Sequence, residues 1–559
     1  MRRHACQFVA VLAFAGGLLT TAPAASAAPI TCAFDATTHV LSVSAPEGSA
    51  PTVKRSGDLL AVTDCLGLTA TVHDTDRIAV TGSYRHFRID LSGGPLAPGF
   101  SPEPDGDPEI ELTADASARQ WVAVVGSDGA DHIRLGATGG FPSINLNATE
   151  AVGDADVVFK GISPNSGALY GGGGDDVLDA RGGVGTGGPL GLRAFDLLDL
   201  NGDDGNDELH GMSGWNRMWG GAGDDRLEVG SGTGSSLYDG AGDDTLIGGA
   251  GDDDFATTGG NDTVTGAGGT DSVTFEFDRL ARGVRLDLQV TGPQDTGHGI
   301  DSFSGIERVV GTGYKDVLRG TSGAEHLSGH YGDDIIMGRG GADELDGEWG
   351  RDVVDYSQAP GPVVVDLTKA APQATGADGN DTLRRFESVI GSRFADSLTG
   401  DAWGNVLDGG AGADTLRGGD GSDRIIPGSS RSGGADGADD ADGGRGIDGL
   451  YYTGRLYRVA VSLDGVRNDG ADPNRDGASS ATEEGDLIAG FENVRGGAGP
   501  DLLVARGPEA NILTGGPGAD VLDAFDGSSV VDKLICGAGA DTYRADPSDA
   551  PDACETAAP

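Results

Sequence analysis

The sequence is poor in the residues that build an ordinary hydrophobic core. Of 559 residues, aromatic side chains make up 6% and hydrophobic residues 37%, while 100 positions are glycine. A chain of this composition and charge is close to a disordered one. Each glycine in a regular element also costs about 0.5–1 kcal/mol relative to alanine. Something other than a hydrophobic core must therefore stabilise any fold that this chain adopts.

Basic residues are scarce as well. The 38 lysines and arginines stand against 88 aspartates and glutamates, which gives a formal net charge of −50. A surface of this charge repels nucleic acid and anionic membranes and attracts cations. We therefore expect cations, and not nucleic acid, among the partners of this protein.

Long apolar runs are absent beyond the first residues. Arg2 and Arg3 precede an apolar stretch at 8–19, and Ala25 and Ala27 supply small residues for cleavage. This pattern predicts a secretory signal peptide over residues 1–27, too short to span a membrane. Since no later apolar run reaches about 18 residues, we expect no transmembrane helix and a secreted, extracellular protein.

Only five cysteines are present, and Cys6 belongs to the signal peptide. An even number in a secreted chain favours disulfides, for which three connectivities are possible. Of these we prefer the local pairs Cys32–Cys65 and Cys536–Cys554, which would close the two ends of the chain. The alternative is that they are free buried thiols.

What the sequence has in abundance is a nine-residue repeat, G-G-x-G-x-D-x-U-x, in which U is a large apolar residue. Residues 409–426 show it twice, as GGAGADTLR and GGDGSDRII. Five copies follow one another without a gap over 311–355, and others keep phase over 391–426 and 202–274, with one slip near Ser235. A fixed phase of this kind is the signature of a repeat architecture.

The repeat predicts a local structure. Three residues around the apolar position form a short strand with the apolar side chain inward. The six residues before it form a tight turn, for which glycine supplies the positive φ angles. Two units make a coil of eighteen residues, and stacked coils give an all-β parallel β-roll, or β-solenoid.

Stacking places equivalent aspartates about 4.8 Å apart, where like charges repel. Half of that spacing, about 2.4 Å, is the length of a calcium–oxygen bond, and the turns expose carbonyl oxygens as further ligands. We therefore predict several Ca²⁺ ions between successive turns and a fold that depends on them. The predicted ligands are Asp131, Asp176, Asp207, Asp225, Asp244, Asp253, Asp262, Asp271, Asp316, Asp334, Asp343, Asp352, Asp396, Asp414, Asp423, Asp448, Asp501, Asp520 and Asp541.

These nonapeptides resemble the RTX, or haemolysin-type, calcium-binding repeats. The resemblance implies a parallel β-roll in which the GGxGxD turn binds calcium and xUx forms the strand. It covers most of the chain between residues 126 and 544. Departures at Asn216, Asn405 and Asn511, and in residues 231–236, which lack the aspartate, mark weaker candidate sites.

The pattern divides the chain into repeat blocks and other segments. Three spacers share a plan, and each carries one glutamate near its end: Glu307, Glu387 and Glu492. These are either calcium ligands or, as we favour, structural caps. The expected segments are a signal peptide (1–27), an N-terminal β cap (28–125), repeat blocks at 126–274, 311–355, 391–448 and 496–544, spacers at 275–310, 356–390 and 449–495, and a tail at 545–559.

Two segments leave alternatives open. Residues 472–483, DPNRDGASSATE, match the ligand spacing of an EF-hand loop, but Ser479 stands where an apolar residue is usual and the flanks do not resemble helices. In the N-terminal cap, alternating runs such as FRIDL at Phe87 predict short strands. These could form either a sandwich or irregular β-helix coils.

No catalytic motif stands out. The sequence contains neither HExxH nor GxSxG, and HLSGH at His326 lies within the repeat phase. We therefore expect a secreted calcium-binding protein with a structural or adhesive role and not an enzyme. Its expected partners are cell-surface glycans or extracellular matrix. The alternative is an RTX-linked extracellular enzyme acting on glycans or proteins.

Overall fold

The computed structural model is built from β-strands throughout its described part, as the sequence predicts. The predicted signal peptide lies outside the described residues. The structure describes residues 29–557 except 57–58, 66–67, 74, 76, 83, 85, 94–110, 117–120, 139–140, 147–156, 161–165, 183–196, 232–233, 276–280, 377, 429–436, 454, 465–468 and 472–485.

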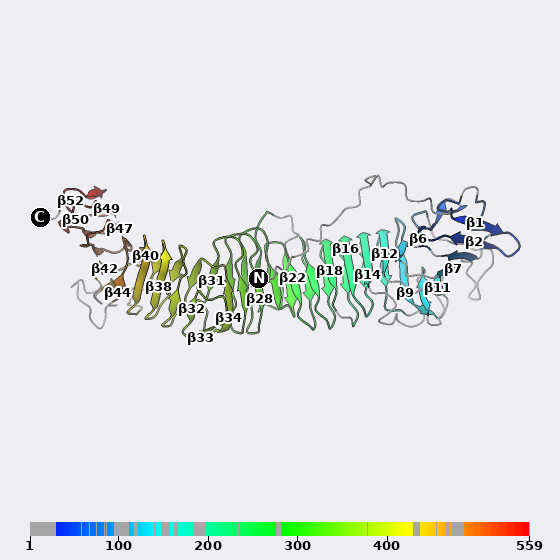
Figure 1. The fold of residues 1–559 in the computed structure, drawn as a ribbon, viewed down its shortest axis with the longest axis horizontal. Coiled ribbons are helices and arrows are strands. Elements are labelled where there is room, and N and C mark those ends of the chain that lie inside the picture. Colours follow the sequence, from blue (N-terminus) through cyan, green and yellow to red (C-terminus); the bar gives the residue numbers. More distant parts are fainter. Residues whose placement is uncertain are drawn as a thin grey trace.

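The strands lie side by side along an elongated rod, from β1 at one end to β52 at the other (Figure 1). They form five sheets, in which nearly all neighbours are parallel. The parallel β-roll is therefore confirmed.

The first sheet contains, in spatial order, β1 (Thr31–Asp35), β2 (Val40–Ala45), β5 (Arg77–Gly82), β7 (Glu111–Ala116), β11 (Val157–Lys160), β10 (Phe141–Asn145), β9 (His132–Thr138), β13 (Val177–Asp179), β15 (Glu208–His210), β17 (Arg226–Glu228), β19 (Thr245–Ile247), β21 (Thr263–Thr265), β25 (Ile300–Ser304) and β24 (Gln294–Asp295). The second contains β33 (Gln373–Gly376), β34 (Gly379–Arg384), β30 (Glu344–Asp346), β28 (His326–Ser328), β26 (Arg308–Val310), β22 (Ser272–Thr274), β20 (Asp254–Ala256), β18 (Ser236–Ala241), β16 (Asn216–Ala222), β14 (Leu197–Asp204), β12 (Ser166–Gly173), β8 (Trp121–Val125), β6 (His86–Asp90), β3 (Thr52–Ser56) and β4 (Leu59–Val62).

The third sheet contains β23 (Arg285–Asp287), β27 (Val317–Arg319), β29 (Ile335–Met337), β31 (Val353–Asp355), β35 (Ser388–Ile390), β37 (Val406–Asp408), β39 (Arg424–Ile426), β41 (Gly449–Tyr451), β45 (Asn493–Arg495), β47 (Ile512–Pro517), β49 (Lys533–Ala538) and β51 (Ala550–Asp552). The fourth contains β32 (Val364–Asp366), β36 (Ser397–Thr399), β38 (Thr415–Gly421), β40 (Asp440–Gly446) and β44 (Leu487–Ala489). The fifth contains β43 (Gly470–Ala471), β42 (Val459–Ser462), β46 (Leu502–Val504), β48 (Val521–Asp523), β50 (Thr542–Arg544) and β52 (Thr556–Ala557).

Each repeat coil contributes one strand to each of two facing sheets. In the third sheet, Leu318 pairs with Ile336 and Ile336 with Val354, so partners are eighteen residues apart, as predicted. All three side chains are fully buried. The core of the roll is therefore one file of aliphatic side chains from each sheet, with the turns along its edges.

The three spacers change which sheets face each other. At the first spacer, β22 pairs directly with β26, so the second sheet runs through. The hairpin of β24 and β25 ends the first sheet, and β23 begins the third. The second spacer ends the second sheet and begins the fourth, and the third spacer ends the fourth and begins the fifth. Each spacer is thus a junction that continues the roll.

The N-terminal strands settle the alternative left open by the sequence. β2, β5 and β7 pair in parallel and extend the first sheet, while β3, β6 and β8 extend the second. They are irregular coils of the same solenoid. β1 and β4 pair antiparallel with β2 and β3 and form the outermost strands of these two sheets.

Both predicted disulfides are present. Cys32–Cys65 joins β1 to the segment after β4, and Cys536–Cys554 joins β49 to the C-terminal residues. Each therefore lies at one end of the solenoid.

Candidate metal centre

The sixth residues of successive turns form ladders of carboxylates along the edges of the roll. The backbone N–H of Asp316 donates to Oδ1 of Asp334 at 2.8 Å, and that of Asp334 donates to Oδ1 of Asp352 at 2.9 Å. In most of these residues one carboxylate oxygen thus accepts a hydrogen bond from the previous coil, and all nineteen predicted ligands belong to such ladders.

There are five ladders among the described residues, each preceding the strands of the sheet with the same number. The first holds Asp131, Asp176, Asp207, Asp225, Asp244, Asp262 and Asp301. The second holds Asp253, Asp271, Glu307, Glu325, Asp343 and Asp381. The third holds Asp316, Asp334, Asp352, Glu387, Asn405, Asp423, Asp448, Glu492, Asn511, Asp532 and Asp549. The fourth holds Asp396, Asp414, Asp439 and Asp486, and the fifth holds Asp501, Asp520, Asp541 and Glu555.

The spacer glutamates are members of these ladders. Oε2 of Glu307, Glu387 and Glu492 accepts the N–H of the preceding ladder aspartate at 2.8–2.9 Å. Each lies two residues before a buried valine of the following strand. Since the apolar residue is the eighth of the repeat, each glutamate holds the sixth position, where other turns have aspartate. Sequence reasoning missed seven further members, because they lie outside the uninterrupted runs of the repeat and do not follow the full G-G-x-G-x-D pattern. These are Asp301, Asp381, Asp439, Asp486, Asp532, Asp549 and Glu555.

In one class of turns, which we call open turns, the second carboxylate oxygen is buried and has no hydrogen-bond partner among the described residues. A buried anionic oxygen without a partner carries a large desolvation cost. These oxygens are Oδ2 of Asp176, Asp207, Asp225, Asp244, Asp334, Asp343, Asp352, Asp414, Asp423, Asp448, Asp520 and Asp541. A cation bound between the turns would supply the missing partner.

Burial raises the pKa of most of these carboxyl groups, and neighbouring carboxylates add to the effect, although the N–H bond from the previous coil opposes it. The pKa of Asp334 and of Asp343 rises to about 8, and that of Asp225 and of Asp414 to about 7. Without a cation, the open turns would therefore hold protons near neutral pH. Carboxylates must be deprotonated to bind a metal, so protons and cations compete for them.

The first glycine of the turn makes room for the carboxylate. A Cβ on Gly409 would lie 2.4 Å from Oδ2 of Asp414 and 2.7 Å from the carbonyl oxygen of Pro427. A Cβ on Gly418 would lie 2.4 Å from Oδ2 of Asp423. A carboxylate oxygen and a carbonyl oxygen of the next coil thus converge beside each glycine, and oxygen atoms are the ligands that calcium prefers.

A second class, the closed turns, satisfies its carboxylate without an ion. The N–H of Thr312 donates to Oδ2 of Asp316 at 2.6 Å, and the N–H of Gly497 donates to Oδ2 of Asp501 at 2.7 Å. The same contact from the second residue of the turn closes the turns of Asp131, Asp253, Glu325 and Asp396, although Oδ1 of Asp253 lacks a partner.

Asn216 shows what the turn carbonyls can bind. Its Nδ2 donates to the carbonyl oxygens of Met212 at 3.1 Å and Gly214 at 2.9 Å, and the N–H of Met212 donates to its Oδ1. The amide group thus occupies the space where turn carbonyls would coordinate a cation. The N–H of Asp401 likewise donates to Oδ1 of Asn405. At both Asn216 and Asn405, asparagine thus stands in place of aspartate in a turn that is closed by hydrogen bonds.

Hydroxyl groups bind the last carboxylate of three ladders. Tyr356 and Thr375 both donate to Oδ2 of Asp381 at 3.0 Å, and Tyr452 donates to Oδ2 of Asp486 at 2.9 Å. Thr296 donates in the same way to Asp301. Protein donors thus satisfy the last carboxylate of the first, second and fourth ladders.

One open turn carries an extra carboxylate. Asp239 takes the place of the first glycine in residues 239–244, and Asp239, Asp244 and Asp262 each bring an oxygen within 4.8 Å of the others. All three are buried. The residues therefore fit a divalent cation. The EF-hand-like match at 472–483 lies outside the described residues.

Comparison with protein families agrees with this geometry. The family described as RTX calcium-binding nonapeptide repeat (4 copies) matches residues 168–186, 199–227, 229–264, 238–273, 301–330, 319–354, 399–430 and 506–543. The chain carries RTX calcium-binding repeats. The RTX matches leave most of each spacer uncovered, where the structure shows the junctions between sheets. No curated protein matches the chain.

Proposed function

We propose that this RTX protein is secreted, that several calcium ions bind its open turns, and that these ions stabilise the roll so that it serves a structural or adhesive role outside the cell. The predicted signal sequence supports secretion, and the two disulfides are typical of extracellular proteins. Among the described residues, no helix has the length and apolarity needed to cross a membrane.

The observation that carries the proposal is the set of buried, unpartnered carboxylate oxygens in the open turns. Hydrogen bonds to the previous coil use one oxygen of each aspartate and leave the other directed at a carbonyl oxygen. A divalent cation there offsets both the repulsion along the ladder and the desolvation of the carboxylates.

The experiment is equilibrium dialysis of the secreted protein against calcium, combined with circular dichroism of the same samples. We expect uptake of several ions per chain together with a gain of β-structure. Absence of uptake, or the same β-structure in chelator and in millimolar calcium, would contradict the proposal.

The chemical role proposed for the protein is binding, not catalysis, because the sequence contains no recognised catalytic motif. A panel of polysaccharide and protein substrates tests this directly. Turnover of any of them by the purified protein would replace the proposed role with an enzymatic one.

A further inference from the structure

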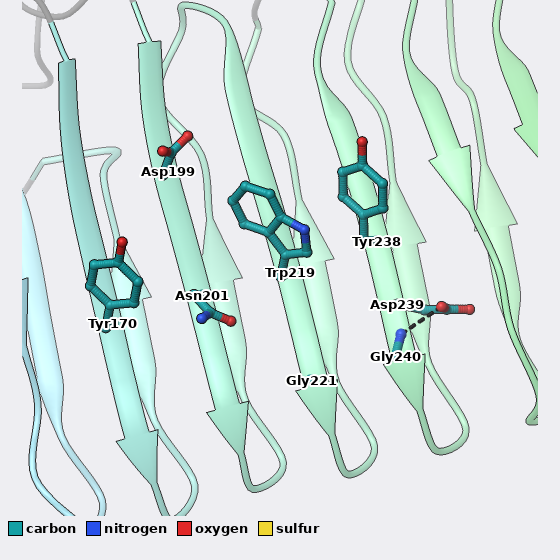
Figure 2. A pocket seen from close by; sticks show the side chains of 8 residues that line it. All are labelled: Tyr170, Asp199, Asn201, Trp219, Gly221, Tyr238, Asp239 and Gly240. Carbon is teal, nitrogen blue, oxygen red and sulfur yellow. Dashed lines mark hydrogen bonds between the residues drawn. The ribbon is translucent and has the colours of Figure 1, made fainter. Parts of the chain in front are cut away.

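The outer face of the second sheet carries a row of three aromatic side chains and one asparagine on four neighbouring strands. Along each strand, side chains alternate between the core and solvent. Because Leu169 and Met218 point into the core, the residues that follow them, Tyr170 and Trp219, point outward. The register places Tyr170, Asn201, Trp219 and Tyr238 side by side on β12, β14, β16 and β18 (Figure 2).

The row is confined to these four coils. On the two flanking strands the same register position is occupied by small or aliphatic residues, Val125 on β8 and Ala256 on β20. The aromatic side chains are therefore not a general property of the repeat. They border an open depression of about 390 Å³ that is also lined by Asp199 and Asp239.

Two of the rings form a flat surface. Trp219 and Tyr238 are near-parallel, with an angle of 10° between the ring planes and centroids 5.5 Å apart. The guanidinium of Arg217 lies 5.4 Å from the centroid of Trp219. Asp199 accepts two hydrogen bonds from this guanidinium at 2.8 and 2.7 Å, which fixes its position.

The charges around the row restrict the ligand. An anionic ligand would meet Asp199, Asp239 and a net charge of −50. A cationic ligand would be repelled by the guanidinium of Arg217, whose central carbon lies 5.4 Å from the centroid of Trp219. A neutral molecule with hydroxyl groups and apolar C–H faces fits both the rings and the hydrogen-bonding groups of Tyr170 and Asn201.

The length of the row favours a chain over a single sugar. Four strands separated by three steps of about 4.8 Å span about 14 Å. We propose that this surface binds a neutral polysaccharide, with sugar rings stacked on Trp219 and Tyr238. The inference rests on the proposed extracellular role and names the partner class for it.

The test is affinity electrophoresis of the full-length protein in calcium, through gels containing dextran, mixed-linkage β-glucan, galactomannan, alginate or chitosan. We expect retardation by at least one of the three neutral polymers. Trp219→Ala and Tyr238→Ala should each weaken that binding at least about tenfold, and Tyr238→Phe should keep most of it because the ring remains.

The matched control is a second aromatic pair outside the row. Tyr331 and Trp349 are also near-parallel, with centroids 6.4 Å apart and an angle of 15°, but they lie on turns of the third ladder. Tyr331→Ala and Trp349→Ala should leave polysaccharide binding unchanged.

Three results would overturn the inference: no retardation by any neutral polymer, retardation by alginate or chitosan alone, or undiminished binding by Trp219→Ala. Circular dichroism of the same samples, with and without calcium, shows whether each variant folds. A normal calcium response without polysaccharide binding would refute this inference and leave the calcium-stabilised roll intact.

Discussion

The N-terminal coils and the repeat coils belong to the same sheets but bury different groups. The coils before residue 92 enclose large apolar side chains, including Ile78, Tyr84 and Phe87, all fully buried. The repeat coil of residues 329–346 buries three apolar side chains, Ile336, Met337 and Leu345, and three carboxylates, Asp334, Asp343 and Asp346. The comparison shows that one apolar core runs along the whole solenoid, to which the repeat coils add turns with buried carboxylates.

A similar contrast exists within one ladder. The turn of Asp316 is closed by the N–H of Thr312, whereas the next turn leaves Oδ2 of Asp334 without a partner. The first residues of the first, third, fourth and fifth ladders all lie in closed turns; they are Asp131, Asp316, Asp396 and Asp501. These ladder ends are thus completed by the protein itself, whereas the open turns depend on another partner.

Removal of calcium gives the largest expected difference between the two regions. In chelator at a pH above about 8, where the open-turn carboxyl groups are ionised, the repeat coils should lose most of their amide-exchange protection because these carboxylates repel one another. The N-terminal coils should retain more, since they bury large apolar side chains and have the Cys32–Cys65 disulfide. Hydrogen exchange with mass spectrometry measures both regions in one sample. Equal loss in both would show that the two regions do not differ in their source of stability.

Acidification should partly replace calcium. The folded pKa is about 6 for Asp244 and Asp423 and about 8 for Asp334, above the ordinary aspartate value of 3.8, so the folded state binds more protons than the unfolded one. This contribution to stability is full below pH 3.8 and is lost as the pH rises through about 8.

In chelator, the thermal midpoint of the repeat coils should therefore rise as the pH falls from 8 to 5. Calcium affinity should fall over the same range, because protons compete for the ligands. A calcium-free midpoint that falls with acid would contradict the assignment of the open turns.

Asp334→Asn tests whether an open turn, unlike a closed one, needs a charged side chain. It keeps an acceptor for the N–H of Asp316 but removes the charge that a cation needs. If one site is lost, the loss of stability at calcium one hundred times the Kd is about 3 kcal/mol. The control is Asp316→Asn in the neighbouring closed turn, where Asn405 shows that an amide is compatible with this geometry. Thermal denaturation across a calcium series measures both, and a control effect as large as that of Asp334→Asn would remove the distinction.

Gly329→Ala gives the smallest expected effect. A Cβ there would lie 2.2 Å from Oδ2 of Asp334, so the carboxylate must move, at a cost of about 1–3 kcal/mol. Gly313→Ala, one turn earlier, meets nothing within 4 Å and should change stability little. Chemical denaturation in calcium compares them. Equal stability of the two variants would show that the first glycine is not needed to accommodate the carboxylate.

The nine-residue phase was enough to predict the roll, the nineteen ladder aspartates and the direction of the inward side chains. It was not enough to decide whether Glu307, Glu387 and Glu492 are ligands or structural caps, because the spacers before them interrupt the repeat phase. Nor does the motif distinguish open from closed turns. Residues 248–253 and 496–501 match the glycine pattern fully yet are closed, because Gly249 and Gly497 do not adopt positive φ.

Some open turns achieve positive φ without glycine. His330, Arg339 and Glu348 adopt φ of 73°, 66° and 64° at the second position of their turns. This conformation is uncommon for such residues and depends on the stacking of the coils. A local motif cannot encode it, so the class of a turn became visible only in the folded roll.

The most direct test of the central claim is an anomalous difference map from crystals grown in millimolar calcium. The account predicts peaks beside the unpartnered carboxylate oxygens of the open turns, such as those of Asp334 and Asp414, each coordinated by oxygen atoms of two successive coils. A well-ordered roll without such peaks would contradict it.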